Sequence, residues 1–126
     1  MSAKKKQKVL FVCYSRCSTC KKARAWLDAN GVDYEYREIV EKKPNQTELR
    51  AWKKLAGVPI RRMFNTSGNL YRELEVKKQL DEGMKDADAI RLLATDGMLV
   101  KRPVLVGEDF AFFGFREAEW AEALGV

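Results

Sequence analysis

An uninterrupted apolar run near the N-terminus, residues 9–14, constrains the fold more strongly than any other feature of the sequence. Successive side chains of a strand point to opposite faces of a sheet, so a run of this kind predicts a strand that is covered on both faces. The chain has 126 residues, which suffices for one compact domain but not for a second one with its own core. We therefore expect one α/β domain built around this strand.

The residues after this strand predict a helix and then a second strand. Four residues at spacings of three and four share one helical face: Cys20, Ala23, Trp26 and Leu27. The helix is expected to end at about Ala29, because Asn30-Gly31 supplies the left-handed residue that commonly follows a helix. Residues 32–39 then alternate with period two, which is typical of a strand. Two strands joined through a helix pair in parallel with a right-handed crossover.

The second half of the chain predicts short helices, two closing strands and a final helix. Helical spacing recurs over residues 47–56, 71–80, 86–94 and 117–124, and a turn-rich segment occupies residues 65–68. Apolar residues at 99–100 and 104–106 predict one closing strand, and residues 110–113 predict the other, paired antiparallel through a tight return at 107–109. The order is βαβ, a helical middle and ββα, which is the plan of thioredoxin-like folds with a mixed sheet.

Charge is unevenly distributed along the chain. The formal net charge is +6, yet Lys4, Lys5, Lys6 and Lys8 contribute four positive charges with no acidic residue among the first eight positions. From Val9 onward, 20 basic residues against 18 acidic residues leave only +2. We therefore expect residues 1–7 to be a flexible, solvated basic arm and residues 8–126 to form the single domain.

The composition excludes several classes of protein. The longest apolar run near the N-terminus has six residues, far short of the roughly 20 that a membrane helix needs, so we expect a cytoplasmic protein without a membrane contact. We also expect a monomer. Trp26, Trp52 and Trp120 fall on apolar helical faces, which favours core packing over base stacking. Because no basic patch is interleaved with aromatic residues, direct binding of nucleic acid is not expected.

A Cys-x-x-Cys motif carries the sharpest chemical signal. Cys17-Ser18-Thr19-Cys20 falls where the first predicted strand ends and the first helix begins. Unpaired N–H groups and the helix dipole stabilise negative charge there, so Cys17 is expected to ionise more readily than a free thiol with its pKa of about 8.5. Cys20 lies three residues later on the same face and can reach the Cys17 sulfur. We predict that Cys17 is a nucleophile and Cys20 a resolving thiol.

Two other interpretations of the cysteines remain open. A zinc site needs four ligands, but the chain has no histidine and its third cysteine, Cys13, lies inside a predicted strand, so no metal site is expected. Coincidence is the other interpretation, because cysteine often serves as a small buried residue. We favour that interpretation for Cys13.

Several ordered motifs resemble the arsenate reductase (ArsC)/Spx family. They are Cys17-Ser18-Thr19-Cys20-Lys21-Lys22-Ala23 with Trp26-Leu27, Phe64-Asn65-Thr66-Ser67-Gly68, Tyr71-Arg72-Glu73-Leu74, Asp96-Gly97-Met98-Leu99-Val100-Lys101-Arg102-Pro103 and Gly114-Phe115. The resemblance covers nearly the whole chain after residue 8, and the paired cysteines resemble the Spx/MgsR-like branch. It implies a thioredoxin/glutaredoxin-like core with an inserted helical segment, which accounts for the helical middle.

The resemblance implies two functions that place the key sulfur at Cys17. Arsenate reductases of this family attack arsenate with one cysteine held among arginines, and glutathione and glutaredoxin regenerate them. Spx-type regulators instead bind the C-terminal domain of the RNA polymerase alpha subunit, and a Cys-x-x-Cys disulfide is their redox switch. We expect a thiol-disulfide redox protein of the arsenate reductase type, with no bound cofactor and with thioredoxin or glutathione/glutaredoxin as external reductant. The regulator is the alternative.

The resemblance also predicts an anion site beside Cys17. Arg102 matches the family's Arg-Pro motif and is expected to face Cys17, with Pro103 in the cis form. Where arsenate reductases carry two further arginines, this chain has Asn65 and Phe115, so these positions supply no guanidinium group for an anion. The other candidates for anion binding are Ser18 and Thr19 at the helix start and Arg61, with Arg62 and Arg116 nearby in the sequence.

Overall fold

A four-stranded mixed sheet forms the centre of the computed structural model, which describes residues 8–126; the arm expected at residues 1–7 lies outside this range. The strands are β1 (Val9–Cys13), β2 (Tyr34–Glu38), β3 (Val104–Val106) and β4 (Ala111–Phe113), in the order β2-β1-β3-β4. β1 pairs in parallel with β2 and antiparallel with β3, and β3 pairs antiparallel with β4. The predicted parallel βαβ unit and antiparallel return are therefore confirmed.

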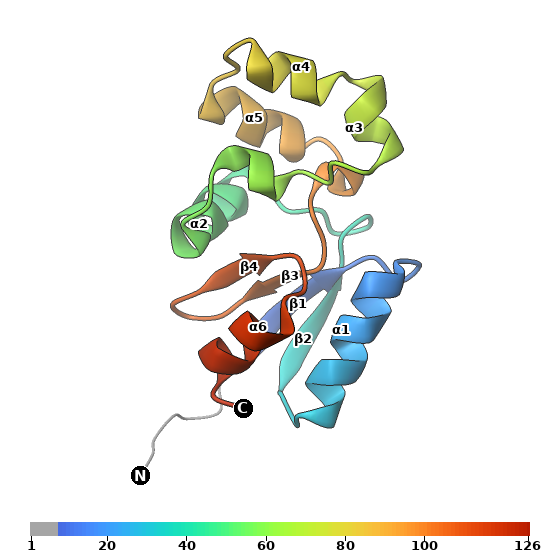
Figure 1. Cartoon of the computed structure of the whole chain (residues 1–126), viewed down its shortest axis with the longest axis vertical. Coiled ribbons are helices and arrows are strands. Elements are labelled where there is room, and N and C mark those ends of the chain that lie inside the picture. The colour runs from blue at the N-terminus through green and yellow to red at the C-terminus, as the bar shows by residue number, and fades with distance from the viewer. Residues whose placement is uncertain (1–7) are drawn as a thin grey trace.

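Helices cover both faces of the sheet (Figure 1). Helices α1 (Ser18–Ala29) and α6 (Glu117–Leu124) pack on one face. The other face is covered by the inserted helical segment, which contains α2 (Gln46–Ala56), α3 (Asn69–Glu73), α4 (Val76–Asp81) and α5 (Asp86–Leu93), with 3-10 turns at Ile60–Met63 and Gly97–Leu99. The molecule thus has three layers, and β1 lies inside the middle one.

The two apolar cores explain why β1 has no polar position. Phe11 and Cys13 join Trp120 in the core beneath α1 and α6, whereas Val12 joins Trp52 in the core of the inserted segment. Phe11, Val12 and Trp120 are fully buried. Because neighbouring residues of β1 enter different cores, each of them is apolar.

The sequence analysis was wrong about residues 99–100. Leu99 ends a 3-10 turn, and Val100 forms only an isolated antiparallel bridge with Phe64. The Asp96 carboxylate accepts a hydrogen bond from the Met98 N–H at 2.9 Å, which favours a turn over an extended strand. The closing strand therefore begins only at β3, after Pro103.

The helix expected over residues 71–80 is divided into two. α3 ends at Glu73 and α4 begins at Val76, and Glu75 between them has a left-handed backbone with φ of 52°. This change of direction lets both Tyr71 and Val76 reach the core. Helical spacing predicted the apolar faces of this segment but not the break between its two halves.

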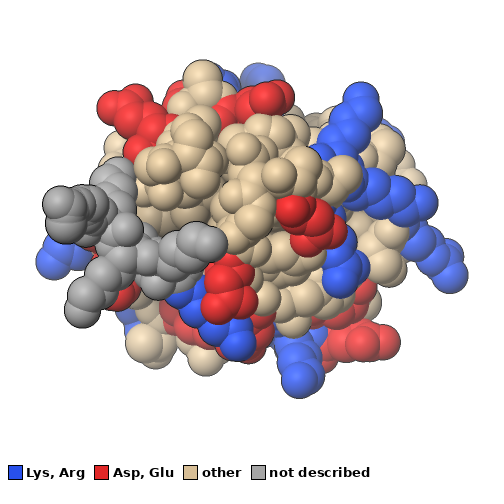
Figure 2. Space-filling view, turned by 90° about the horizontal axis from the view of Figure 1, so that it is seen from below, with Lys and Arg blue, Asp and Glu red and all other residues tan. Residues whose placement is uncertain are grey.

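Charged side chains of both signs are mixed on the face that lies at the lower end of Figure 1, and several Lys and Arg side chains gather along one edge (Figure 2). An ion pair ties the sheet to the inserted segment, because Arg37 of β2 contacts Glu48 of α2 at 2.7 Å. In the part of the chain from residue 8 to 126, no helix is long and apolar enough to cross a membrane.

Candidate functional site

The loop after β1 places Cys17 at the start of α1. Cys17 is the residue that precedes the first helical turn, its backbone is extended, and its side chain forms no capping hydrogen bond. A hydrogen bond of 2.9 Å from the Cys17 N–H to the Tyr14 carbonyl closes the loop. The half-buried sulfur therefore lies at the positive end of a 12-residue helix.

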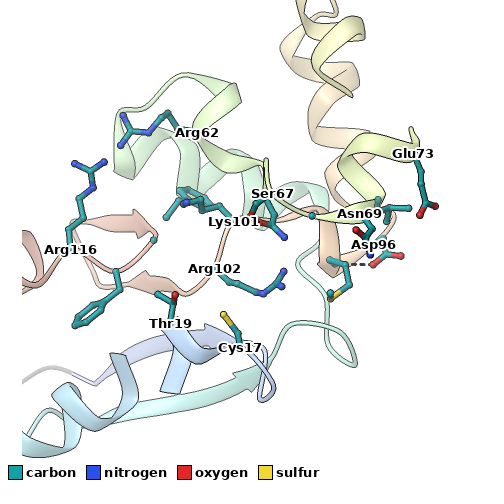
Figure 3. Close-up of a pocket in the computed structure, with 17 residues that line it drawn as sticks. Cys17, Thr19, Arg62, Ser67, Asn69, Glu73, Asp96, Lys101, Arg102 and Arg116 are labelled. Atoms are coloured by element: carbon teal, nitrogen blue, oxygen red, sulfur yellow. Dashed lines mark hydrogen bonds between the residues drawn. The ribbon is translucent and has the colours of Figure 1, made fainter. Parts of the chain in front are cut away.

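A cavity of about 730 Å³ opens above Cys17. Figure 3 shows Cys17 and Arg102 in its middle, with Arg62 and Arg116 toward one end and Glu73 and Asp96 toward the other. Four of its lining residues are basic and two are acidic: Arg62, Lys101, Arg102 and Arg116 against Glu73 and Asp96. The cavity around the sulfur is therefore suited to an anionic ligand.

Arg102 presents unused hydrogen-bond donors next to Cys17. Its Nε and Nη1 atoms are buried and have no hydrogen-bond partner among the described residues. Its guanidinium carbon lies 5.0 Å from the centre of the Tyr14 ring, which holds the side chain by a cation–π contact. The peptide bond that joins Arg102 to Pro103 is cis, the isomer expected for Pro103. Buried N–H groups without acceptors are costly, by about 1–3 kcal/mol each, so an oxyanion between Arg102 and Cys17 would be favourable.

The environment of Cys17 favours its thiolate. Burial raises the pKa of the Cys17 thiol, but the nearby N–H group and thiol of Cys20, the Thr19 N–H and the Arg102 side chain favour a negative sulfur and outweigh this effect. The net result is a pKa below the ordinary value of a cysteine. A lowered pKa increases the fraction of Cys17 that is thiolate, which is the nucleophilic form of cysteine.

Cys20 lies one helical turn further on and is almost completely buried. Its side chain is 1% exposed, and its sulfur accepts a hydrogen bond from the Tyr14 N–H at 3.3 Å. The hydrogen bond to Cys13 and the burial raise the pKa of the Cys20 thiol far above its ordinary value. The opposite directions of the two pKa shifts favour ionisation of Cys17 over ionisation of Cys20.

The three other predicted anion-binding residues lie in different places. Thr19 lines the cavity, whereas Ser18 is exposed at the start of α1 and does not line it. Arg61 also lies outside the lining, because its guanidinium pairs with Asp81 of α4 at 2.6 Å. The structure therefore brings Thr19 to the site but not Ser18 or Arg61.

The two positions where arsenate reductases carry further arginines both line the cavity. Asn65 contributes an amide, and Phe115 contributes an aromatic ring that lies 4.8 Å from the Trp120 ring, measured between centroids. Arg62 and Arg116 line the same cavity from other elements. Positive charge is therefore present at this end of the cavity, but it comes from positions that spacing alone did not assign to the site.

No group of three or more metal-ligating side chains suitable for a metal ion occurs within residues 8–126. Cys13 is 2% exposed and lies in the core beneath α1. The neighbouring Cys20 and Tyr36 side chains hold the pKa of the Cys13 thiol below its ordinary value. The sequence analysis treated Cys13 only as a core residue. It missed Tyr36, because only the pairing of β1 with β2 brings the Tyr36 and Cys13 side chains together.

The lowered pKa of Cys17 predicts unusual reactivity toward alkylating reagents. The thiolate is the reactive form, so the alkylation rate rises as pH passes through the pKa. In the folded protein we expect the midpoint for Cys17 to lie at a lower pH than in guanidinium chloride, where the thiol regains a pKa of about 8.5. Iodoacetamide labelling followed by mass spectrometry of the peptides measures both midpoints. Equal midpoints would contradict the effect of the helix and Arg102.

Comparison with known proteins identifies the family. The ArsC family model matches residues 13–123. YusI, an uncharacterized protein of Bacillus subtilis, is 38% identical over 112 residues, which cover 89% of this chain and 94% of YusI. A global transcriptional regulator Spx of Streptococcus pyogenes is 27% identical over 103 residues, which cover 82% of this chain and 75% of Spx.

Solved structures agree with this assignment. An ArsC family related protein from Bacteroides fragilis is 45% identical with a TM-score of 0.89, covering 94% of this chain and 98% of the other. A possible arsenate reductase from Streptococcus mutans is 38% identical with a TM-score of 0.82, covering 91% and 97%. The predicted thioredoxin-like fold is thereby confirmed. From the family match and these similarities over most of its length, the chain belongs to the ArsC family.

Proposed function

We propose that this chain is a thiol-disulfide redox protein of the arsenate reductase type. In this proposal Cys17 attacks an oxyanion substrate, Cys20 resolves the covalent adduct and Arg102 binds the substrate's negative charge. The observation that carries it is the position of the Cys17 sulfur at the start of α1, facing a basic cavity in which Arg102 offers two buried donors without partners. Such a site stabilises both a thiolate and an anion bonded to it.

The proposed reaction has two chemical steps. The Cys17 thiolate attacks the arsenic atom of arsenate, a sulfur–arsenic bond forms, and one arsenate oxygen leaves as water. Cys20 then attacks the Cys17 sulfur, the sulfur–arsenic bond breaks, and its electron pair stays on arsenic. The products are arsenite and a Cys17–Cys20 disulfide, so arsenic gains the two electrons that the thiols lose. An external thiol reductant, thioredoxin or glutathione with glutaredoxin, restores the dithiol.

Arsenate-dependent oxidation of NADPH tests this function. The protein is coupled either to thioredoxin and thioredoxin reductase or to glutathione, glutaredoxin and glutathione reductase. We expect turnover that depends on arsenate with one of these reductants, and the comparison identifies which one serves the protein. Absence of arsenate-dependent turnover with both would overturn the assignment of arsenate as substrate.

Arg102→Gln is expected to lower kcat/KM for arsenate about 100-fold, the typical cost of losing one donor to a reacting oxyanion. Glutamine keeps a polar side chain but removes the charge and the forked donors. The matched control is Arg50→Gln, because Arg50 is exposed on α2 and does not line the cavity. If both variants behaved like the unmodified protein, Arg102 would have no role in binding the anion.

The regulator alternative rests on the relatives named Spx and not on the geometry of the cavity. Calorimetry with the C-terminal domain of the RNA polymerase alpha subunit tests it, using the protein with Cys17 and Cys20 first reduced and then oxidised. Micromolar or tighter binding that changes with redox state, together with no turnover, would replace the enzymatic proposal with the regulatory one.

A further inference from the structure

The cavity above Cys17 is much larger than the oxyanion that the proposed function places in it. Its volume is about 730 Å³. Arsenate is a single tetrahedral ion, whereas cavities of roughly 300–1,000 Å³ enclose organic ligands of drug size. The cavity therefore has room for a carbon skeleton attached to the group that reacts with Cys17.

Two arginines from different parts of the chain meet at one end of this cavity. Figure 3 shows Arg62 and Arg116 toward that end, while Cys17 and Arg102 lie in the middle. Arg62 belongs to the second 3-10 turn residue pair of the inserted segment, and Arg116 immediately precedes α6. Both residues also line a small hollow of about 90 Å³ that shares part of its wall with the cavity. The two arginines therefore border one common space.

Lys101 reaches the same end of the cavity because residue 114 is glycine. Gly114 has a left-handed backbone with φ of 102°, and a Cβ atom at this position would lie 3.1 Å from the Lys101 Cε atom. The lysine stem therefore runs directly over Gly114, which lies two residues before Arg116 in the chain. We call Arg62, Lys101 and Arg116 the cationic subsite.

The protein itself does little to neutralise the cationic subsite. Neither Arg62 nor Lys101 takes part in any ion pair between described residues. Arg116 lies 3.8 Å from the Glu119 carboxylate, a long distance for an ion pair. Because basic groups gathered in this way repel one another, an anion that enters between them is stabilised, and a guanidinium group matches the fork of a carboxylate.

The rest of the lining determines which way an organic ligand would lie. Glu73 and Asp96 are toward the opposite end of the cavity and would repel a carboxylate (Figure 3). Phe113 and Phe115 also line the cavity and offer apolar surface to a carbon skeleton. A ligand with a carboxylate at one end would therefore place it at the cationic subsite and its sulfur over Cys17.

We propose that the cationic subsite binds the carboxylate of an organic disulfide whose sulfur is attacked by Cys17. The Cys17 thiolate attacks one sulfur, a mixed disulfide forms, and the other half of the ligand leaves as a thiolate. Cys20 then attacks the Cys17 sulfur, and its proton goes to the second half, which leaves as a thiol. The ligand gains the two electrons that Cys17 and Cys20 lose. The exchange rests on the proposed function, because it uses the same roles of Cys17 and Cys20.

Three small disulfides that differ mainly in their end groups test the subsite. Dithiodipropionate carries carboxylates, dithiodiethanol is neutral and cystamine is cationic. Quenching with N-ethylmaleimide and peptide mass spectrometry measure how fast each disulfide consumes the free Cys17 thiol. Division by the rate of the same disulfide with mercaptoethanol removes its intrinsic reactivity. We expect the corrected rate for dithiodipropionate to exceed that for dithiodiethanol about tenfold, to exceed that for cystamine further, and to fall as salt is added.

Variants separate the subsite from the charge beside the sulfur. Arg62→Gln combined with Arg116→Gln should lower the corrected rate for dithiodipropionate about tenfold and leave that for dithiodiethanol unchanged, because glutamine keeps a polar side chain without the charge. Lys101→Gln should act in the same direction and carries the test if the double variant does not fold. The matched control is Arg61→Gln, because Arg61 pairs with Asp81 outside the cavity lining and should leave both rates unchanged.

Three outcomes would overturn the inference. They are equal corrected rates for dithiodipropionate and dithiodiethanol, an equal loss of both rates in the double variant, and an equal loss for dithiodipropionate in Arg61→Gln. A preference for the carboxylate without arsenate turnover would support the subsite and overturn arsenate as the substrate. Failure of Cys17 to react with all three disulfides would overturn its role as the nucleophile, and the exchange with it.

Discussion

Cys17→Ser is expected to lower arsenate turnover by at least about 1,000-fold, and with it the reaction of residue 17 with dithiobis(nitrobenzoate), a disulfide that releases thionitrobenzoate when a thiolate attacks it. The hydroxyl of serine does not ionise near neutral pH, and the help that the helix and Arg102 give to a thiolate is far too small to change that. Without the first covalent bond, Cys20 has nothing to resolve. Turnover retained in this variant would remove Cys17 from the mechanism.

The same substitution has an opposite effect on stability. Cys17 is the cap residue of α1 and forms no side-chain capping hydrogen bond. Serine is among the preferred residues at this position, and a good cap contributes about 0.5–2 kcal/mol. We expect the free energy of unfolding of Cys17→Ser to equal or exceed that of the unmodified protein in denaturant titration. Lost activity with preserved stability would show that Cys17 is kept for its chemistry.

The secondary structure that local patterns determine was predicted well. β1 and β2 follow from apolar runs and alternation, and α1 follows from its spacing and from the Asn30-Gly31 stop. The prediction failed where a local side-chain hydrogen bond competes with the apolar pattern. Residues 99–100 are apolar as a strand would be, but the Asp96 side chain stabilises a turn before them.

The candidate site was predicted only in part, because some of its residues are distant in sequence from Cys17. Cys17 and Cys20 belong to one helix start, so their proximity follows from sequence spacing alone. Arg102 is distant in sequence and was identified only through the family resemblance. The sequence analysis assigned Arg61 to the site and not Arg62. In the structure these adjacent side chains point in different directions: Arg61 pairs with Asp81, and only Arg62 of the two lines the cavity.

The neighbours that β2 provides to Cys13, Tyr36 and Glu38, could not be identified from the sequence. They lie in a strand whose alternating pattern predicts one exposed and one covered face, and nothing local shows which chemical groups the covered face meets. The register between β1 and β2 decides this, because it sets Cys13 opposite Glu38. A shift of one residue would turn Tyr36 and Glu38 to the opposite face.

Cys20→Ser is expected to stop the reaction after its first step. Cys17 should react with dithiobis(nitrobenzoate) at nearly the unmodified rate, because Cys17 keeps its place at the helix start and beside Arg102. In the unmodified protein, attack of Cys20 on the mixed disulfide at Cys17 releases a second thionitrobenzoate. This second release should be absent in the variant, because serine cannot form a disulfide with Cys17. Mass spectrometry should then find one stable thionitrobenzoate adduct on Cys17, and arsenate turnover should cease.

The serine of this variant is also a fair structural replacement. It is close in size to cysteine, and its oxygen can accept the hydrogen bond that the Tyr14 N–H gives to the Cys20 sulfur. Stability should therefore change little compared with the loss of the second release. A second release that persisted at the unmodified rate would exclude Cys20 as the resolving thiol. Because Cys13 is the one other cysteine besides Cys17, that release would have to come from Cys13, and Cys13→Ser in the same background would abolish it.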